Sequence, residues 1–307
     1  MNEQLIVKYI RTKKKIRKVV TYREHGELRK YHEAVAKYLQ NNTFNSIFAK
    51  AYVRKSSIFL NAKAHMYNDI FIKMDICNFF PSINHEYMAK CLYREVNKVA
   101  EISNKECYDI VRRCSVGNKG LPLGLVSSPA LANLYLKEFD GLFYGQLKKM
   151  NLDNVIYTRY ADDLVVSFKY NEECGREYEE NADKIIRQAE CLLKRFYMKL
   201  NKKKLHVVNL YKSNHIRITG ISITKNGQGY RHISVGKKLK NEIFWETLEL
   251  YDNPNMRNNV RIEHLKGLFS FVISIEKQGI DAGYSDRMKS LIKERGFNNL
   301  KEMIIAL

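Results

Sequence analysis

Apolar residues recur at helical spacing in several parts of this chain. In residues 28–40 they fall at Leu28, Tyr31, Val35, Tyr38 and Leu39, one face of an amphipathic helix. The same period predicts further helices at about 85–98, 103–114 and 175–198, and from residue 236 to the end. Helices therefore occupy much of the chain and all of its last part.

Short runs rich in β-branched and aromatic residues lie between these helices and predict strands. They are found at residues 68–83, on both sides of Asp162, and at 205–209, 215–223 and 230–235. A basic segment at residues 7–23 runs into Val19–Thr21 and predicts a charged hairpin or edge strand, with a solvated charged face as the alternative. The pattern is that of an α+β protein.

Prolines mark two places where the backbone is fixed. Of four prolines, Pro81, Pro122 and Pro129 lie in the segments "NDIFIKMDICNFFPSI" and "GLPLGLVSSPALANLYLKEFD". In the second segment, residues 120–140, a Gly/Pro loop turns into a helix. Ser128 is expected to cap this helix, and Pro129 is expected at its first position.

Length and charge limit the kind of protein. With 307 residues and 45% hydrophobic composition, the chain can bury a core as one large domain or two to three small subdomains. Lys and Arg number 53 against 33 Asp and Glu, a net charge of +20 that favours polyanionic partners. Without an apolar run of about 18–20 residues or a signal-peptide core, we expect a soluble cytosolic protein. The six cysteines show no C-x-x-C pair, so neither a zinc site nor a disulfide framework is expected.

Three aspartates suggest metal chemistry. Asp162 and Asp163 stand side by side in "YTRYADDLVVSF", and Asp75 ends another apolar run. Adjacent carboxylates repel each other unless a cation lies near them, and Mg²⁺ prefers oxygen ligands. Together they could hold two ions about 3.5–4 Å apart, as in nucleotidyl transfer. The alternative is that the pair are ordinary turn residues.

The motifs "DICNFFPSI", "GLPLGLVSSPALAN" and "YADD" resemble, in order and spacing, those of reverse transcriptases, over about residues 8–275. The resemblance implies a right-hand polymerase that copies RNA into DNA with two Mg²⁺ ions, or Mn²⁺ in their place. The fold class is then α+β, with an antiparallel palm sheet flanked by helices and a helical thumb. We expect fingers at 1–68 with further elements near 84–118, the palm at 69–235, and the thumb at 236–307.

Matching the motifs position by position assigns the catalytic residues. Asp75 and Asp162 would hold the ions, and Asp163 matches the last, usually less critical, aspartate of the metal-binding set. "LNKKKL" at 200–205 resembles the Asn-x-x-Lys-Thr segment of the family, which makes Lys204 a candidate proton donor to pyrophosphate. The usual Thr is Leu205 here, and a solvated lysine is the alternative for Lys204.

The resemblance also assigns a nucleotide pocket. Phe80 matches the aromatic gate that would exclude a 2′-hydroxyl, with a core phenylalanine as the alternative, and Ile76 is placed beside the nucleotide. Arg17 would bind the triphosphate, helped by Lys15 or its neighbours Lys13 and Lys14. Many relatives have Gln where "GLPLG" has Leu123, a departure that would alter fidelity or nucleotide choice but not remove catalysis.

Other elements are similar to those of retron reverse transcriptases. "NAKAH" at 61–65 matches their Asn-Ala-x-x-His element, "ITG" at 218–220 matches a Val-Thr-Gly element, and "HLKGLFSFV" at 264–272 looks like their thumb helix. Asn61, His65, Thr219 and Gly220 would lie near the template RNA, although a lone histidine is more often structural. The thumb candidates for structured RNA are Lys237, Lys238, Lys240, Arg257, Arg261 and Lys266.

A retron enzyme would bind a structured noncoding RNA and prime from the 2′-hydroxyl of an internal guanosine. It would use dNTPs to make a branched RNA–DNA molecule, multicopy single-stranded DNA, within the bacterial cytoplasm. An effector protein and a role in antiphage defence are implied, with no membrane partner. The chain leaves no length for a ribonuclease H or endonuclease domain, and the first helix of typical retron enzymes is short or missing. The alternatives are another bacterial defence or group II-like reverse transcriptase without branched priming, and a non-catalytic RNA-binding scaffold.

Overall fold

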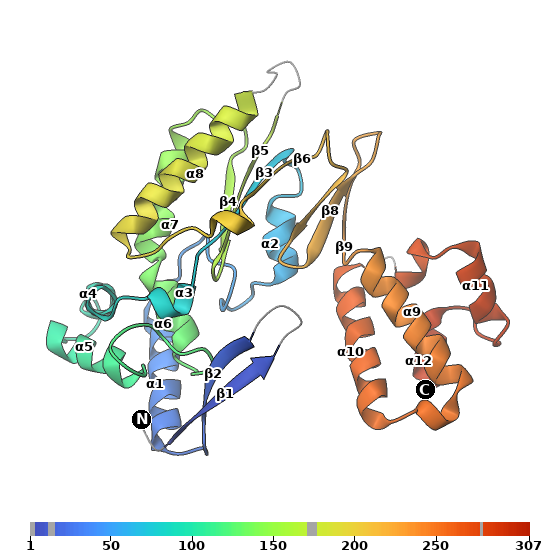
Figure 1. Cartoon of the computed structure of the whole chain (residues 1–307), viewed down its shortest axis with the longest axis horizontal. Helices are drawn as coiled ribbons and strands as arrows, with labels where there is room; N and C mark the ends of the chain where they lie inside the picture. Colours follow the sequence, from blue (N-terminus) through green and yellow to red (C-terminus); the bar gives the residue numbers. More distant parts are fainter. Residues whose placement is uncertain (1–3, 12–15, 171–176, 277–278) are drawn as a thin grey trace. The chain divides into compact units, whose positions relative to one another are not determined.

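The computed structural model describes residues 4–11, 16–170, 177–276 and 279–307 (Figure 1). The chain divides into two compact units, Met1–Asn209 and Leu210–Leu307. Both combine helices with antiparallel strands, so the predicted α+β class is confirmed. None of the described helices is long and apolar enough to cross a membrane.

The first unit begins with the expected basic hairpin. Strands β1 (Leu5–Arg11) and β2 (Ile16–Tyr22) pair antiparallel, and helix α1 (Glu27–Asn42) follows as predicted. The lysines 13–15 between the two strands, including Lys15, lie outside the described residues. A short helix, α2 (Ile58–Ala64), leads into the central sheet.

The central sheet has four antiparallel strands in the order β4-β5-β3-β6. Its strands confirm four of the predicted runs: β3 (Ile70–Asp75), β4 (Ile156–Tyr160), β5 (Asp163–Phe168) and β6 (His206–Asn209). Strand β3 is almost fully buried, which explains why its sequence is nearly continuously apolar.

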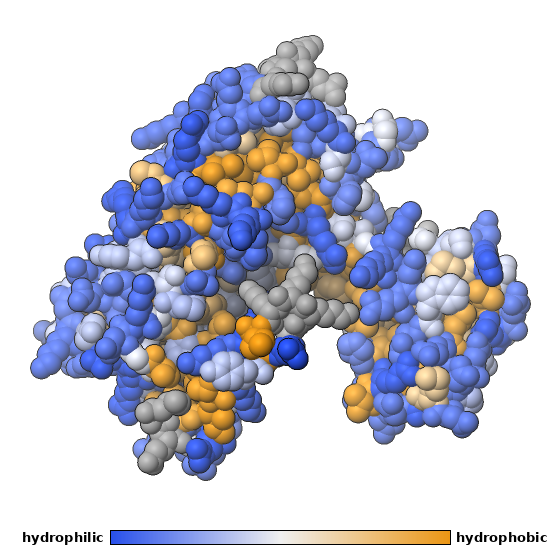
Figure 2. Space-filling model, viewed as in Figure 1, coloured by the Kyte–Doolittle hydropathy of each residue, from blue (hydrophilic) through white to orange (hydrophobic). Residues whose placement is uncertain are grey.

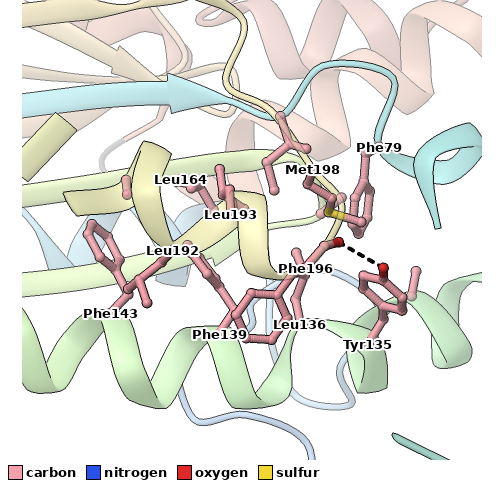
Figure 3. Close-up of a cluster of buried hydrophobic side chains, with 14 of the residues drawn as sticks. Phe79, Tyr135, Leu136, Phe139, Phe143, Leu164, Leu192, Leu193, Phe196 and Met198 are labelled. Carbon is pink, nitrogen blue, oxygen red and sulfur yellow. Dashed lines mark hydrogen bonds between the residues drawn. The ribbon is translucent and has the colours of Figure 1, made fainter. Parts of the chain in front are cut away.

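The other helices of the first unit pack on one another and, through α8, on this sheet. They are α3 (Phe79–Ser82), α4 (His85–Val96), α5 (Asn104–Arg113), α6 (Ser128–Tyr135), α7 (Lys137–Lys148) and α8 (Glu177–Arg195). In Figure 3, Phe139 and Phe143 of α7 and Leu192 and Leu193 of α8 gather around Leu164 of β5, and all five are buried. This packing holds the β4–β5 hairpin, which carries the aspartate pair, against a rigid core.

The predicted cap of α6 is wrong by one residue. Helix α6 starts at Ser128, so Ser127 is the capping position, with no side-chain cap, and Pro129 is the second helical residue. The hydroxyl of Ser128 instead donates to the carbonyl of Pro122 at 2.7 Å, which closes the preceding loop onto the helix.

The second unit opens with a three-stranded antiparallel sheet, ordered β7 (His215–Ile218), β8 (Ile221–Lys225) and β9 (Arg231–Ser234). The prediction of one strand at 215–223 is therefore wrong. Thr219 and Gly220 both have positive φ, 45° and 89°, and form the two-residue turn of a hairpin. Four helices follow: α9 (Lys237–Asp252), α10 (Asn259–Ile275), α11 (Asp286–Lys293) and α12 (Leu300–Ile305).

The described cysteines differ in burial. Cys77, Cys91, Cys107, Cys114 and Cys191 are free thiols, three of them buried, while Cys174 lies outside the described residues. In this part of the chain, packing rather than covalent cross-linking therefore stabilises the fold.

Candidate active site

Strand pairing brings the three aspartates to one end of the central sheet. Asp75, the last residue of β3, lies directly opposite Asp163, the first residue of β5. Directly opposed residues project to the same face of a sheet. The amide of Ile76 donates to the carbonyl of Asp162 at 2.9 Å, which holds the turn beside the end of β3. The predicted cluster is thus assembled from residues almost ninety positions apart.

The turn that carries Asp162 is strained. Tyr160 pairs with Asp163, so Ala161 and Asp162 form a two-residue turn. Ala161 is buried and has φ of 56°, a left-handed conformation that costs a residue with a Cβ about 1–2 kcal/mol. Such conformations persist where the surrounding structure enforces them, and they cluster at functional sites.

The segment after α8 forms hydrogen bonds with Asp75. The Nζ of Lys204 donates to Oδ1 of Asp75 at 2.5 Å, and Nδ2 of Asn201 donates to Oδ2 at 3.3 Å. The amide of Asn201 also donates to the carbonyl of Asp75 at 2.7 Å. Lys204 belongs to a short 3₁₀ turn, η2 (Lys202–Lys204), which starts at Asn201. Sequence reasoning identified Lys204 but missed Asn201, although both belong to the Asn-x-x-Lys segment.

Carboxylate repulsion is visible in the electrostatics of the cluster. Burial, followed by the charges of Asp162 and Asp75, raises the pKa of Asp163 to about 6 from an ordinary 3.8. The hydrogen bond to Asp75 raises the pKa of Lys204, so this ammonium keeps its proton near neutrality. The cluster therefore carries negative charge that Lys73 and Lys204 only partly neutralise.

The chemistry of this donor set fits a divalent cation. All three side chains offer hard oxygen ligands, and a divalent ion between them would remove the repulsion that raises the pKa of Asp163. As arranged, however, the described residues contain no group of three His, Cys, Asp or Glu side chains closed around a single ion. Lys204 occupies one oxygen of Asp75, so an ion held there would share this carboxylate with the lysine.

The predicted nucleotide residues occupy different environments. Phe80 is 8% exposed and packs on Phe79 with 5.1 Å between ring centroids, which also suits a core phenylalanine. The side chain of Ile76 is 1% exposed, so it presents no surface to a nucleotide. Arg17 is exposed on β2. A nucleotide contact from each of them stays a prediction.

The "GLPLG" loop connects Phe80 with strand β2, the two sides of the predicted nucleotide pocket. At one end, the amide of Leu121 donates to the carbonyl of Phe80 at 2.9 Å. At the other, the amide of Val20 on β2 donates to the carbonyl of Leu123 at 2.7 Å. Gly124 has φ of 104°, and a Cβ there would clash with the carbonyl oxygen of Val20. Only glycine allows the hairpin to dock this closely.

Asn61 and His65 lie inside the protein. Both side chains are fully buried, and the two ring nitrogens of His65 hydrogen-bond to the hydroxyls of Ser167 and Thr158 at 2.7 Å each. Burial lowers the pKa of His65 to about 3, so its ring is neutral. The "NAKAH" element thus attaches α2 to strands β4 and β5. A direct contact with template RNA stays a prediction that this geometry does not support.

The sequence analysis did not identify a buried network of hydrogen bonds and an ion pair beneath the aspartate turn. Arg159 is fully buried and pairs with Asp140 at 2.8 Å, and Tyr157 donates to the same carboxylate at 2.7 Å. Nη1 of Arg159 also donates to Oδ1 of Asn133 at 3.1 Å. The signal was an arginine within an apolar strand, because a buried charge needs a buried partner.

Several of the candidate RNA-binding residues in the second unit already form ion pairs or hydrogen bonds within the protein. Arg261 is bound by Glu246 and Glu249 at 2.7 and 2.8 Å. Lys240 is buried in an ion pair with Glu276 at 2.8 Å, a geometry that does not support contact with RNA, so its role there stays a prediction. Arg257 donates to the last carbonyls of α9. Lys237, Lys238 and Lys266 are exposed, and Thr219 and Gly220 form the β7–β8 turn.

Known proteins are similar to this chain in sequence and in fold. The family "Reverse transcriptase (RNA-dependent DNA polymerase)" matches residues 12–223. The retron Ec83 reverse transcriptase of Escherichia coli is 28% identical over 248 residues, covering 79% of this chain and 74% of that protein. The retron Ec73 reverse transcriptase of the same species is 34% identical over 140 residues, covering 42% of this chain and 44% of that protein.

One solved structure shares the fold at low sequence identity. A chain of Candida albicans telomerase, solved with the TWJ fragment of telomeric RNA, superposes with a TM-score of 0.54 at 11% identity. The match covers 98% of this chain and 59% of the telomerase chain. At that identity the likeness concerns the fold alone.

Proposed function

Because this chain belongs to the reverse transcriptase (RNA-dependent DNA polymerase) family, we propose that it is the polymerase of a retron. In this proposal it copies a structured noncoding RNA, with dNTPs, into branched multicopy single-stranded DNA. Support for the retron type comes from the retron Ec83 enzyme, whose similarity spans 79% of this chain. A bacterial cytoplasmic location, an effector partner and a role in antiphage defence belong to the same proposal.

The observation that carries the catalytic part is the aspartate cluster. Asp75 and Asp163 face each other across β3 and β5, Asp162 lies in the adjoining turn, and Lys204 reaches Asp75 from η2. Reverse transcriptases generally use divalent metal ions, and we propose Mg²⁺ here, held by Asp75 and Asp162 with Asp163 beside them. When bound, the metal neutralises charge on the triphosphate and the attacking oxygen.

The remaining roles belong to side chains of this chain. A 3′- or 2′-hydroxyl loses its proton to water and attacks the α-phosphate of the dNTP. The new phosphodiester bond forms as the bond from the α-phosphorus to the β-phosphate oxygen breaks, and pyrophosphate leaves. Lys204, protonated because its pKa is raised, donates a proton to the leaving pyrophosphate. Phe80 packs against the sugar of the incoming nucleotide, and Arg17 binds its triphosphate from the exposed face of β2.

We assign these parts to fingers (1–68, with elements near 84–118), palm (69–235) and thumb (236–307). The exposed Lys237, Lys238 and Lys266 provide cationic groups for RNA phosphates. Thr219 and Gly220 would present the β7–β8 turn to the same RNA.

The polymerase proposal is tested with Asp162→Asn on a supplied RNA template and DNA primer. We expect dNTP incorporation to fall at least about a thousandfold, because the variant removes one metal-binding charge. The matched control is Asp153→Asn, the same chemical change at an exposed site beyond the far end of the β4–β5 hairpin. Full extension by the Asp162→Asn variant would refute the metal assignment.

The retron proposal needs the native flanking DNA. The protein is expressed with that DNA, and total nucleic acid is tested for a short DNA that the Asp162→Asn variant does not make. A DNA whose 5′ end is freed only by debranching enzyme supports retron priming. A homopolymer or protein-linked DNA from an active enzyme would instead indicate a defence reverse transcriptase with another priming mode.

A further inference from the structure

Residues 48–51 form an extra edge beside the strand that leads to the catalytic turn. The amide of Arg159 donates to the carbonyl of Phe48 at 2.8 Å, and the amide of Lys50 donates to the carbonyl of Arg159 at 2.7 Å. Ala49 and Arg159 are thus bridged in parallel. Tyr52 therefore lies three residues after a bridge to the strand that ends at the catalytic turn.

Buried side chains anchor this segment. Nδ2 of Asn133 donates to the carbonyl of Ala51 at 2.8 Å, and Oδ1 of Asn133 accepts from Arg159. Arg159 is in turn fixed by its ion pair with Asp140. One buried network therefore holds both the aspartate turn and the segment that ends at Tyr52.

Tyr52 itself has the features of a contact residue. Its side chain remains 51% exposed although it follows a segment fixed in the core. Its φ is 59°, a left-handed conformation that is uncommon for a bulky residue and marks functional sites. Burial raises the pKa of its hydroxyl, with further contributions from the charges of Asp162 and Tyr160, so this hydroxyl lies near the catalytic turn.

The surroundings of Tyr52 suit a nucleic-acid strand. Arg54 and Lys55 follow it, and both are exposed. Tyr52 and Phe44, which is 86% exposed, both line a small pocket. Exposed aromatic rings with adjacent cations are how proteins hold unpaired nucleotides, the rings by stacking and the cations through phosphates.

We propose that Tyr52 is a further substrate-contacting residue, whose ring stacks on a nucleotide of the polynucleotide strand held at the Asp75, Asp162 and Asp163 cluster. The inference rests on the proposed polymerase function and adds a residue that positions the strand for reaction. The ligand chemistry is a base with its sugar, supplied by either the template strand or the primer end. Arg54 and Lys55 contact the phosphates of the same strand.

The first test measures binding without catalysis. Wild-type protein and variants are titrated onto a fluorescent RNA-template/DNA-primer in EDTA, followed by anisotropy. We expect Tyr52→Ala to raise Kd about 5- to 150-fold, the range for losing one base–aromatic stack, while Tyr52→Phe stays within about threefold of wild type. Alanine and tyrosine both have a Cβ, so the cost of the left-handed backbone at residue 52 stays the same. The change in Kd therefore reports the loss of the ring.

The matched control is Tyr67→Ala. Tyr67 is 66% exposed and precedes β3 at the end opposite Asp75. This variant should bind as wild type does, and thermal melting checks that both variants fold. Unchanged affinity in a folded Tyr52→Ala protein would overturn the proposal. Absence of dNTP incorporation by the wild type would instead refute the polymerase function, so the two failures are distinguishable.

The second test identifies the strand. Titrations are repeated with an abasic site either at the templating position or at the primer 3′ end. The duplex that lacks the stacked base should bind wild type and Tyr52→Ala with equal affinity, whereas the other duplex should keep the full difference. A difference that persists in both duplexes would show that the ring does not stack on either base and would overturn the proposal.

Discussion

Asp163 connects the electrostatics of the catalytic cluster with the stability of the protein. Its pKa is raised to about 6, so between its ordinary value of 3.8 and that value the folded state binds more protons than the unfolded state. Stability therefore decreases as pH rises through this window, contrary to the usual behaviour of a paired carboxylate. Near neutrality, in the absence of metal, the ionised Asp163 destabilises the folded state.

We accordingly predict a pH-dependent effect of Asp163→Asn. The variant should match wild type near pH 4 and exceed its free energy of unfolding at pH 7 by at most about 3 kcal/mol, since the shift is about two units. Urea unfolding at several pH values in EDTA measures the difference. A difference that does not change with pH would contradict the raised pKa.

Among single residues, the charged catalytic candidates were easier to predict from the sequence than the residues that hold them in place. Asp75, Asp162, Asp163 and Lys204 were found because their types and spacing are distinctive. Asn201, Arg159 and Tyr52 were missed, because their importance depends on what lies beside them after folding. His65 illustrates the same limit: the motif identified the residue, but only the structure shows that both ring nitrogens are used inside the protein.

Among the elements, the β1–β2 hairpin depends on one glycine for its position. Gly124→Ala should disturb docking of β2, because the new Cβ would clash with the carbonyl oxygen of Val20 and φ is 104°. We expect a loss of stability above about 2 kcal/mol, or a raised KM for dNTPs if the hairpin moves instead.

Gly141→Ala is the control for this prediction. Gly141 lies in α7, and a Cβ added to it would meet no neighbouring atom within 4 Å, so alanine should stabilise the helix by about 0.5–1 kcal/mol. Thermal unfolding and dNTP titration of both variants provide the comparison. Equal behaviour of the two variants would show that the close approach is not required.

The buried ion pair beneath the catalytic turn should matter far more than a surface pair. Asp140→Asn leaves Arg159 charged and buried, which should cost about 3–5 kcal/mol. Arg94→Met removes the exposed pair with Glu138 and should cost less than about 1 kcal/mol. Urea unfolding compares them, and a small effect at Asp140 would show that the network can reorganise.

Element types were largely predictable from periodicity, as α1, α4, α5 and α8 show, whereas some boundaries were not. The run at 215–223 has the composition of one continuous strand, but the left-handed Thr219 and Gly220 divide it into β7 and β8. Likewise, the hydroxyl of Ser128 bonds to Pro122 rather than capping α6. Tertiary contacts decided both cases, and the local sequence does not specify them.

For the whole molecule, the net charge of +20 predicts binding that is dominated by phosphate contacts. Figure 2 shows hydrophilic residues over much of the viewed face. Charge alone, however, does not identify the contacts. Lys237 is exposed, whereas Arg261 is held by two glutamates of α9, so these two cations of the second unit should behave differently.

We predict that Lys237→Ala lowers the slope of log Kd against log salt for RNA binding by about one, without changing stability. Arg261→Ala should instead lower the melting temperature, because it removes the link between α9 and α10. Filter binding from about 50 to 200 mM salt, together with thermal melts, tests both variants. The reverse pattern would mean that Arg261 leaves its glutamates to bind RNA.

Leu123 shows how a position can vary in its side chain while its backbone contact is kept. It contributes to the loop between Phe80 and β2 through its carbonyl, which accepts from Val20 whatever the side chain is. The side chain takes no part in that hydrogen bond; it is partly buried and packs against the hydrophobic core of the first unit. Directed evolution of nucleotide preference should therefore begin at this codon, where a library can include glutamine and other residues while the scaffold stays intact.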